Sequence, residues 1–131
     1  MKKKEVIFYE GNAFKSIDDI LELKAGNKGS VSGMGYMQEI QLTERKIKNF
    51  WKKMDELDVW GWEKNYSSFD RICDGHVWEL RLRNKDGKAK VVGGYVEYPH
   101  NFNKVIKALN NLFGSKIESI EDLNIENEVV E

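Results

Sequence analysis

The densest group of side chains that could do chemistry is the segment Asp70-Arg71-Ile72-Cys73-Asp74-Gly75-His76. Cys73 could act as a nucleophile with His76 as its base, or Asp70, Asp74 and His76 could hold a metal ion. A nucleophilic cysteine also needs a third group that orients its base, and metal sites usually repeat a ligand spacing such as CxxC or HxxxH, which this chain lacks. We therefore interpret Asp74-Gly75 as a turn and Cys73 as a small core residue. The prediction is a protein without catalytic residues, metal or cofactor, with an enzyme using Cys73 and His76 as one alternative.

Two other polar features also favour a structural interpretation. The glycine-rich stretch over residues 26–35 lacks the Gly-x4-Gly-Lys-Ser/Thr spacing of a phosphate-binding loop, and a strand-like segment follows it instead of a helix. We interpret it as a hairpin loop. His100 lies between Pro99 and Asn101 at the start of a predicted helix, and we interpret it as a surface residue.

Aromatic residues give the first candidate binding surface. Trp60, Trp62, Tyr66 and Phe69 follow the first predicted helix in a polar stretch. If Trp60-Gly61-Trp62 is extended, both rings point to the same side. Because Trp, Tyr and Arg dominate binding hot spots, these four residues are candidate partner contacts. The alternative is that such rings fill the groove between helix and sheet, which is our interpretation of Trp51 and Trp78.

The charge is unevenly distributed. The chain carries 21 Lys plus Arg and 22 Asp plus Glu, for a net charge of −1. Residues 115–131 hold six acidic residues and one lysine, so this segment is close to −5 and the body close to +4. Binding by bulk charge is excluded and nucleic acid is an unlikely partner. The tail is either a solvated terminus or a segment that folds onto the basic body or meets a basic partner, with Glu118, Glu121 and Asp122 as candidate contacts.

The periodicity predicts two helices. One runs from Thr43 to Leu57 with Thr43 as N-cap, and the other runs from Asn101 to Phe113, with Asn101 able to cap it and Gly114 ending it. Predicted strands cover residues 5–9, 30–42 and 77–83, and residues 88–96 return as the hairpin partner of 77–83 across an Asn84–Gly87 turn. The hairpin is expected to carry cross-strand ion pairs on an outer face made of Glu79, Arg81, Arg83, Lys88 and Lys90. Residues 16–23 suit either a helix or a strand. The expected fold is α+β: a single domain with an antiparallel sheet of about four to five strands and two helices on one face.

Length and composition agree with this fold. A chain of 131 residues fits one domain, which we place at residues 1–114, followed by an acidic C-terminal tail at 115–131. The single cysteine excludes an internal disulfide. No apolar run approaches the roughly 20 residues of a membrane helix, and the basic start lacks the apolar segment of a signal peptide. The expected setting is the cytoplasm, without a membrane partner.

Three short motifs carry a resemblance. The chain contains Trp62-Glu63-Lys64-Asn65-Tyr66, then Asp74-Gly75-His76-Val77-Trp78-Glu79-Leu80, then Tyr98-Pro99-His100-Asn101-Phe102. Over residues 40–114 it resembles a set of small, largely uncharacterised bacterial proteins with the pattern W-x3-Y, D-G-x2-W-x-L and Y-P-x-N-F. It departs from them at His76-Val77 and at Glu97. The resemblance implies an antiparallel sheet with two helices and brings no catalytic group with it.

Small single-domain bacterial proteins without catalytic motifs often serve as immunity proteins, which neutralise a toxin. By this analogy of type, we expect a non-enzymatic protein-binding module that binds a cognate toxin domain. The alternatives are an inhibitor of a host defence system encoded by a mobile element, and the small enzyme described above.

Overall fold

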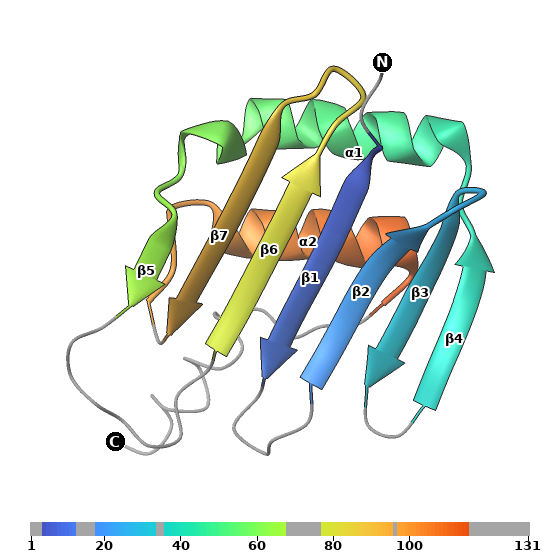
Figure 1. Cartoon of the computed structure of the whole chain (residues 1–131), viewed down its shortest axis with the longest axis horizontal. Coiled ribbons are helices and arrows are strands. Elements are labelled where there is room, and N and C mark those ends of the chain that lie inside the picture. The colour runs from blue at the N-terminus through green and yellow to red at the C-terminus, as the bar shows by residue number, and fades with distance from the viewer. Residues whose placement is uncertain (1–3, 13–17, 34–35, 68–76, 96, 116–131) are drawn as a thin grey trace.

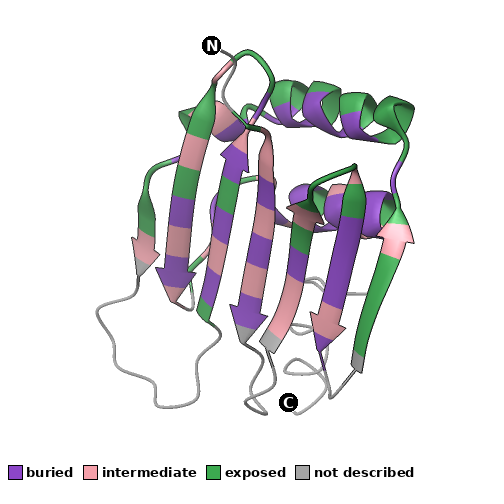
Figure 2. Ribbon diagram, turned by 45° about the vertical axis from the view of Figure 1, so that its right-hand side comes forward, coloured by how far each residue is buried: buried purple, intermediate pink, exposed green. Residues whose placement is uncertain are grey.

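The computed structural model describes residues 4–12, 18–33, 36–67, 77–95 and 97–115. These residues form a mixed sheet with the strand order β4-β3-β2-β1-β6-β7-β5, and two helices lie behind it (Figure 1). Both helices cover the same face of the sheet (Figure 2), and their buried residues belong to the core cluster. The α+β class and the single domain with two helices are thus confirmed.

The sheet is larger than the sequence predicted. Within the described ranges it has seven strands instead of four to five: β1 Val6–Asn12, β2 Asp18–Lys24, β3 Lys28–Gly33, β4 Tyr36–Gln41, β5 Asn65–Ser67, β6 Val77–Arg83 and β7 Ala89–Tyr95. Neighbouring strands are antiparallel except β5, which pairs parallel to β7. The prediction of a purely antiparallel sheet is therefore wrong at this edge.

Two strand predictions were wrong or incomplete for local reasons. Residues 30–42 were expected to form one strand, but β3 and β4 are separate strands that pair with each other, Ser30 opposite Glu39. Of the ambiguous segment 16–23, residues 18–23 belong to the strand β2, which buries Leu21, and residues 16–17 lie outside the described residues. The turn between β2 and β3 places Gly26 and Asn27 at positive φ, which glycine and asparagine tolerate best.

The first helix and the β6–β7 hairpin agree with the sequence. Helix α1 spans Glu44–Glu56, and the Thr43 hydroxyl accepts a hydrogen bond from the Lys46 amide at 3.1 Å. At the hairpin, the Asn84 side chain accepts the amides of Asp86 and Lys88, and Gly87 has a φ of 93°. A side-chain cap and a turn glycine act over a few residues, which is why their sequence signals are dependable.

Helix α2 spans Phe102–Phe113 and ends as predicted at Gly114, which has a φ of 67°. Its start differs from the expectation. Asn101 has a φ of 69° and makes no side-chain capping bond; its side-chain Nδ2 atom donates instead to the Leu57 carbonyl at 3.4 Å. The start of α2 is thereby joined to the end of α1, and the two helices run in opposite directions (Figure 1).

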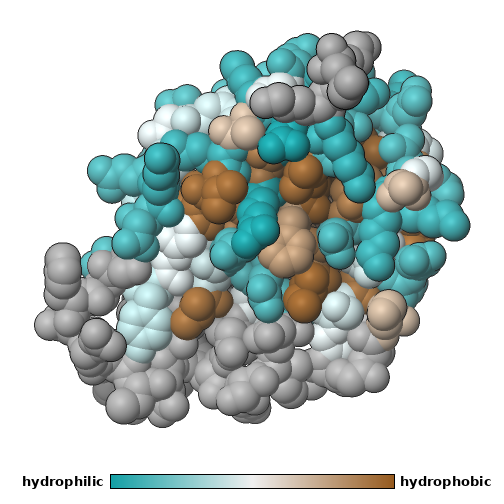
Figure 3. All heavy atoms as spheres, viewed as in Figure 1, coloured by the Kyte–Doolittle hydropathy of each residue, from teal (hydrophilic) through white to brown (hydrophobic). Residues whose placement is uncertain are grey.

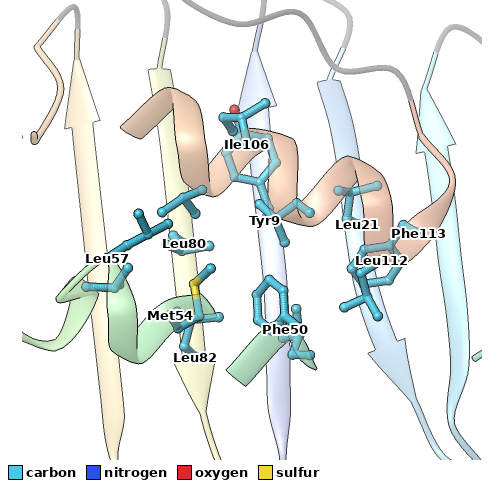
Figure 4. Packing of buried hydrophobic residues seen from close by; sticks show 14 of the residues in the cluster. Tyr9, Leu21, Phe50, Met54, Leu57, Leu80, Leu82, Ile106, Leu112 and Phe113 are labelled. Carbon is cyan, nitrogen blue, oxygen red and sulfur yellow. The ribbon is translucent and has the colours of Figure 1, made fainter. Parts of the chain in front are cut away.

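The core lies between the helices and the sheet. Figure 4 shows Tyr9, Leu21, Leu80 and Leu82 from the strands facing the two helices. The largest side chains that are almost fully buried include Trp78, Tyr9, Phe113, Ile7, Leu21, Met54, Leu80, Leu82, Ile106 and Leu109. Burial of such side chains contributes roughly 1.5–3 kcal/mol each, which makes this layer the main source of stability. None of the helices in the described ranges is both long and apolar enough to cross a membrane.

Candidate functional site: the uncovered sheet face

The sheet face opposite the helices has no covering element in the described ranges, and it carries the exposed apolar residues. The large hydrophobic side chains that are exposed there are Met37 at 69%, Val91 at 56% and Val77 at 49%. The strand register places each of them on this face, because Val77 and Val91 alternate with the buried Trp78 and Val92, and Met37 lies opposite Ser32. Brown apolar patches interrupt the teal surface in Figure 3. We call this surface, from β4 to β7, the open face.

One row of residues crosses the middle of the open face. The register aligns Glu39, Ser30, Glu22, Phe8, Arg81 and Val91 on six neighbouring strands. The Arg81 guanidinium lies 5.7 Å from the centre of the Phe8 ring and forms an ion pair with Glu79. The row thus combines an aromatic ring, an aliphatic side chain and charges of both signs. Such a mixture suits a protein surface better than a phosphate backbone, because the carboxylates would repel phosphate.

The prediction of which residues form the outer face of the hairpin is partly wrong. Glu79, Arg81 and Arg83 do lie on the open face, but Lys90 pairs with Leu82 and belongs to the helix side. Lys88 precedes β7, and its ammonium lies 5.9 Å from the centre of the Trp60 ring. The ion pair that forms here joins two residues of one strand, Glu79 and Arg81, instead of crossing between strands.

Trp78 is the centre of an aromatic cluster at the β5 end of the core. Its ring stacks on Tyr66 at 6.3 Å and on Tyr98 at 6.2 Å, and contacts Phe102 at 4.7 Å between ring centroids. Its indole N–H donates to the Glu97 carbonyl at 3.0 Å. The side chain is 1% exposed, so the interpretation of Trp78 as a core residue is confirmed. Aromatic contacts of this kind contribute about 0.5–1.5 kcal/mol each beyond area burial.

The aromatic candidates of the sequence separate into different environments. Residues 59–61 form a short 3-10 helix instead of an extended segment, so the rings of Trp60 and Trp62 have different partners. Trp60 stacks on Trp51 at 6.1 Å, and its indole N–H donates to the Asp55 carboxylate at 2.7 Å. Trp62 is 7% exposed and stacks on Phe102 at 6.5 Å.

The remaining candidates lie deeper or elsewhere. The hydroxyl of Tyr66 accepts the Glu63 amide at 2.9 Å, and its ring packs on the core. Trp51 is 9% exposed and donates its indole N–H to Glu5 at 2.6 Å, so its interpretation as a core residue also holds. Phe69, Glu118, Glu121 and Asp122 lie outside the described residues, as does the whole cluster over residues 70–76 with Cys73 and His76.

Two tyrosines of the described residues have raised pKa values. Burial raises the pKa of Tyr98 to about 12. Burial, and then the charges of Asp19 and Tyr98, raise the pKa of Tyr9 well above its usual value. Both shifts keep a phenol neutral, as expected for rings that serve packing. His100 is exposed. In the part of the chain that the structure describes, no three His, Cys, Asp or Glu side chains gather in a way that could hold a metal ion.

Sequence reasoning missed the open face as a surface. The alternation over residues 77–83 placed Glu79, Arg81 and Arg83 outward, and the same alternation in β7 could have placed Val91 beside them. Met37 could not be placed, because β3 and β4 were merged into one strand. Comparisons with protein-family models, with curated proteins and with solved structures gave no match for this chain. The function is therefore inferred from the geometry.

Proposed function

We propose that this chain is a non-enzymatic protein-binding module, an immunity protein that neutralises a bacterial toxin by binding it directly through the open face. One observation carries the proposal: the exposed large apolar side chains of the described residues, Met37, Val77 and Val91, all lie on the sheet face that no helix covers. Exposed apolar side chains that share one face mark interaction surfaces more often than scattered ones do.

The dimensions of the open face suit a protein partner. From β4 to β7 there are five steps between strands of about 4.8 Å, or roughly 24 Å, and each strand extends for roughly 20 Å. The flat area of about 500 Å² is more than half of the roughly 800 Å² that each partner contributes to a standard interface. Residues around its rim would supply the remainder.

The charges of the open face favour a protein over a nucleic acid. Glu10, Glu22 and Glu79 lie on this face together with Lys24, Arg81 and Arg83, and the register sets Glu10 opposite Glu79. A partner with a complementary mosaic of charges would be selected by this pattern, because like charges that meet across an interface oppose binding.

The first test is genetic. The gene is deleted in the native host while its neighbouring genes stay intact, and growth is measured in contact with cells that make the host's toxins. The proposal predicts that the deletion strain is inhibited and that the gene on a plasmid restores growth. Normal growth of the deletion strain, with every toxin domain of the host expressed in turn, would contradict the assignment.

The second test locates the contact. Val91→Glu places a carboxylate opposite Arg81, which favours folding of the strand pair. We expect this variant and Met37→Glu to weaken binding of the purified toxin domain at least about 30-fold, as hot-spot residues do. Lys48→Glu on the exposed side of α1 is the matched control and should bind as the wild type. Equal binding by all three variants would refute the open face as the contact surface.

A further inference from the structure

A second surface lies on the other side of the molecule, between the outer sides of α1 and α2. It is a groove of about 680 Å³ lined by Lys46, Asn49, Phe50, Lys53, Leu57, Lys104, Lys107, Ala108, Asn111 and Leu112. The buried Phe50, Leu57 and Leu112 form its apolar floor, and the lysines lie exposed along its walls. We call it the basic groove.

The basic groove has an excess of positive charge. Its lining holds four lysines and no carboxylate. Lys53 forms an exposed ion pair at 3.4 Å with Glu56, which lies next to the groove. Lys46, Lys104 and Lys107 form no ion pair with any acidic residue that the structure describes. An occupant with several carboxylates and an apolar side would therefore complement both the walls and the floor.

We infer that the basic groove is the docking site of the chain's own acidic tail, residues 116–131. This segment carries six acidic residues against Lys116, and the apolar residues Ile117, Ile120 and Leu123 are spaced at every third position among them. The apolar residues would pack on the apolar floor of the groove, and the carboxylates of Glu118, Glu121 and Asp122 would pair with the lysines of its walls.

The path of the chain makes this docking feasible. Helix α2 ends at Phe113, one residue after Leu112, which lines the groove. Gly114 is in the left-handed conformation and the Ser115 amide bonds back to the Asn110 carbonyl at 3.1 Å, so the chain turns at this point. From Asn111 back to Lys104 the groove follows α2 for about 10 Å. Sixteen residues reach about 50 Å when extended and about 24 Å when helical, so the tail can cover the groove in either form.

The docking goes beyond the proposed function and holds whether or not a toxin binds the open face. It assigns an intramolecular contact to Glu118, Glu121 and Asp122. Since the tail is tethered next to its site, its effective concentration there is on the order of millimolar, which a weak contact is sufficient to fill. A basic partner would have to displace the tail from the lysines before it could bind these carboxylates.

Zero-length carbodiimide cross-linking of the full chain tests the inference. It joins a lysine to a carboxylate only when the two are in contact. We expect cross-links from Glu118, Glu121 and Asp122 to Lys46, Lys53, Lys104 and Lys107 that are at least tenfold more abundant than cross-links to Lys24 and Lys28 on the open face. A salt concentration of about 1 M shortens the Debye length to about 3 Å and should suppress the cross-links between the tail and the groove. Mixing ¹⁴N- and ¹⁵N-labelled protein separates intramolecular from intermolecular products.

A matched pair of variants completes the test. Lys104→Glu with Lys107→Glu should abolish the cross-links from the tail to Lys46 and Lys53, while Lys24→Glu with Lys28→Glu should leave them unchanged. Amide spectra of the full chain carrying Glu118→Gln, Glu121→Gln and Asp122→Asn should then differ from the wild type along α1 and α2. Cross-links spread evenly over all lysines, products that are only intermolecular, or spectral changes confined to the sheet would each overturn the inference.

Discussion

Gly94 lies where β7 passes between Trp78 and β5, and replacing it by alanine tests the packing of the aromatic cluster. A Cβ atom at this position would lie 2.5 Å from the Trp78 Nε1 atom and 2.7 Å from both its Cε2 atom and the Tyr66 carbonyl oxygen. Trp78 cannot move aside easily, because its indole is stacked between Tyr66 and Tyr98 and donates to the Glu97 carbonyl. The carbonyl of Tyr66 belongs to the backbone of β5.

The neighbouring Gly93 supplies the matched control. A Cβ atom at Gly93 would meet only the Trp78 carbonyl oxygen at 3.5 Å, an ordinary contact. Both substitutions remove the same conformational freedom from the unfolded chain. This raises the free energy of unfolding by about 0.4–1 kcal/mol in each variant and cancels when the two are compared. The remaining difference is the overpacking at Gly94, about 1–3 kcal/mol.

The two free energies of unfolding are measured by guanidinium denaturation, followed by tryptophan fluorescence and by circular dichroism. We expect Gly94→Ala to be less stable than Gly93→Ala by about 1–3 kcal/mol. For a domain of this size, that difference lowers the melting temperature by roughly 3–15 °C. Near-ultraviolet circular dichroism should also change in Gly94→Ala, because Trp78 loses its fixed surroundings. A difference within about 0.5 kcal/mol would refute the close approach of β7 to Trp78, since this is the usual range for neutral surface changes.

Three further substitutions test the local interactions. Thr43→Ala should lower the free energy of unfolding by about 0.5–2 kcal/mol, because α1 loses its cap. Thr43→Ser keeps a hydroxyl and should retain most of the stability of the wild type, so an equal loss in both variants would contradict the cap. Asn84→Ala should cost about 1–3 kcal/mol, because two turn amides lose their acceptor, whereas Asn84→Asp keeps it; denaturation curves decide. Burial raises the pKa of Tyr98 to about 12 from 10.0 in the unfolded chain, so its stabilising contribution is complete below pH 10 and lost as the pH rises toward 12. Tyr98→Phe should therefore flatten the fall of the melting temperature between pH 10 and 12, and an unchanged slope would contradict the burial of the phenol.

The parts of the fold that the sequence predicted well depend on short-range chemistry. The apolar stripe of α1 and the Thr43 cap fixed that helix almost to the residue. The alternation of Trp78, Leu80 and Leu82 with charged residues predicted β6 with its exact partner strand, because the Asn84–Gly87 turn joins the two directly. Each of these signals acts within one turn of helix or one hairpin.

The parts that were predicted wrongly depend on contacts between distant segments. β5 is only three residues long, and Gly94 of β7 leaves room for its backbone, because a Cβ atom there would lie 2.7 Å from the Tyr66 carbonyl oxygen. Trp60 and Trp62 have different partners because the chain turns sharply after α1, where Asp58 adopts a positive φ. No pattern within residues 59–67 contains this information.

The same division applies to the candidate sites. The sequence by itself determined the α+β class, both helices, the β6–β7 hairpin and the opposite charges of body and tail, because composition and periodicity are properties of the chain. Only the tertiary structure decided that Met37, Val77 and Val91 share the face that no described helix covers and that lysines of α1 and α2 line one groove. Strand order and helix pairing are set by burial of the whole core, in which residues far apart in the chain compete for the same partners.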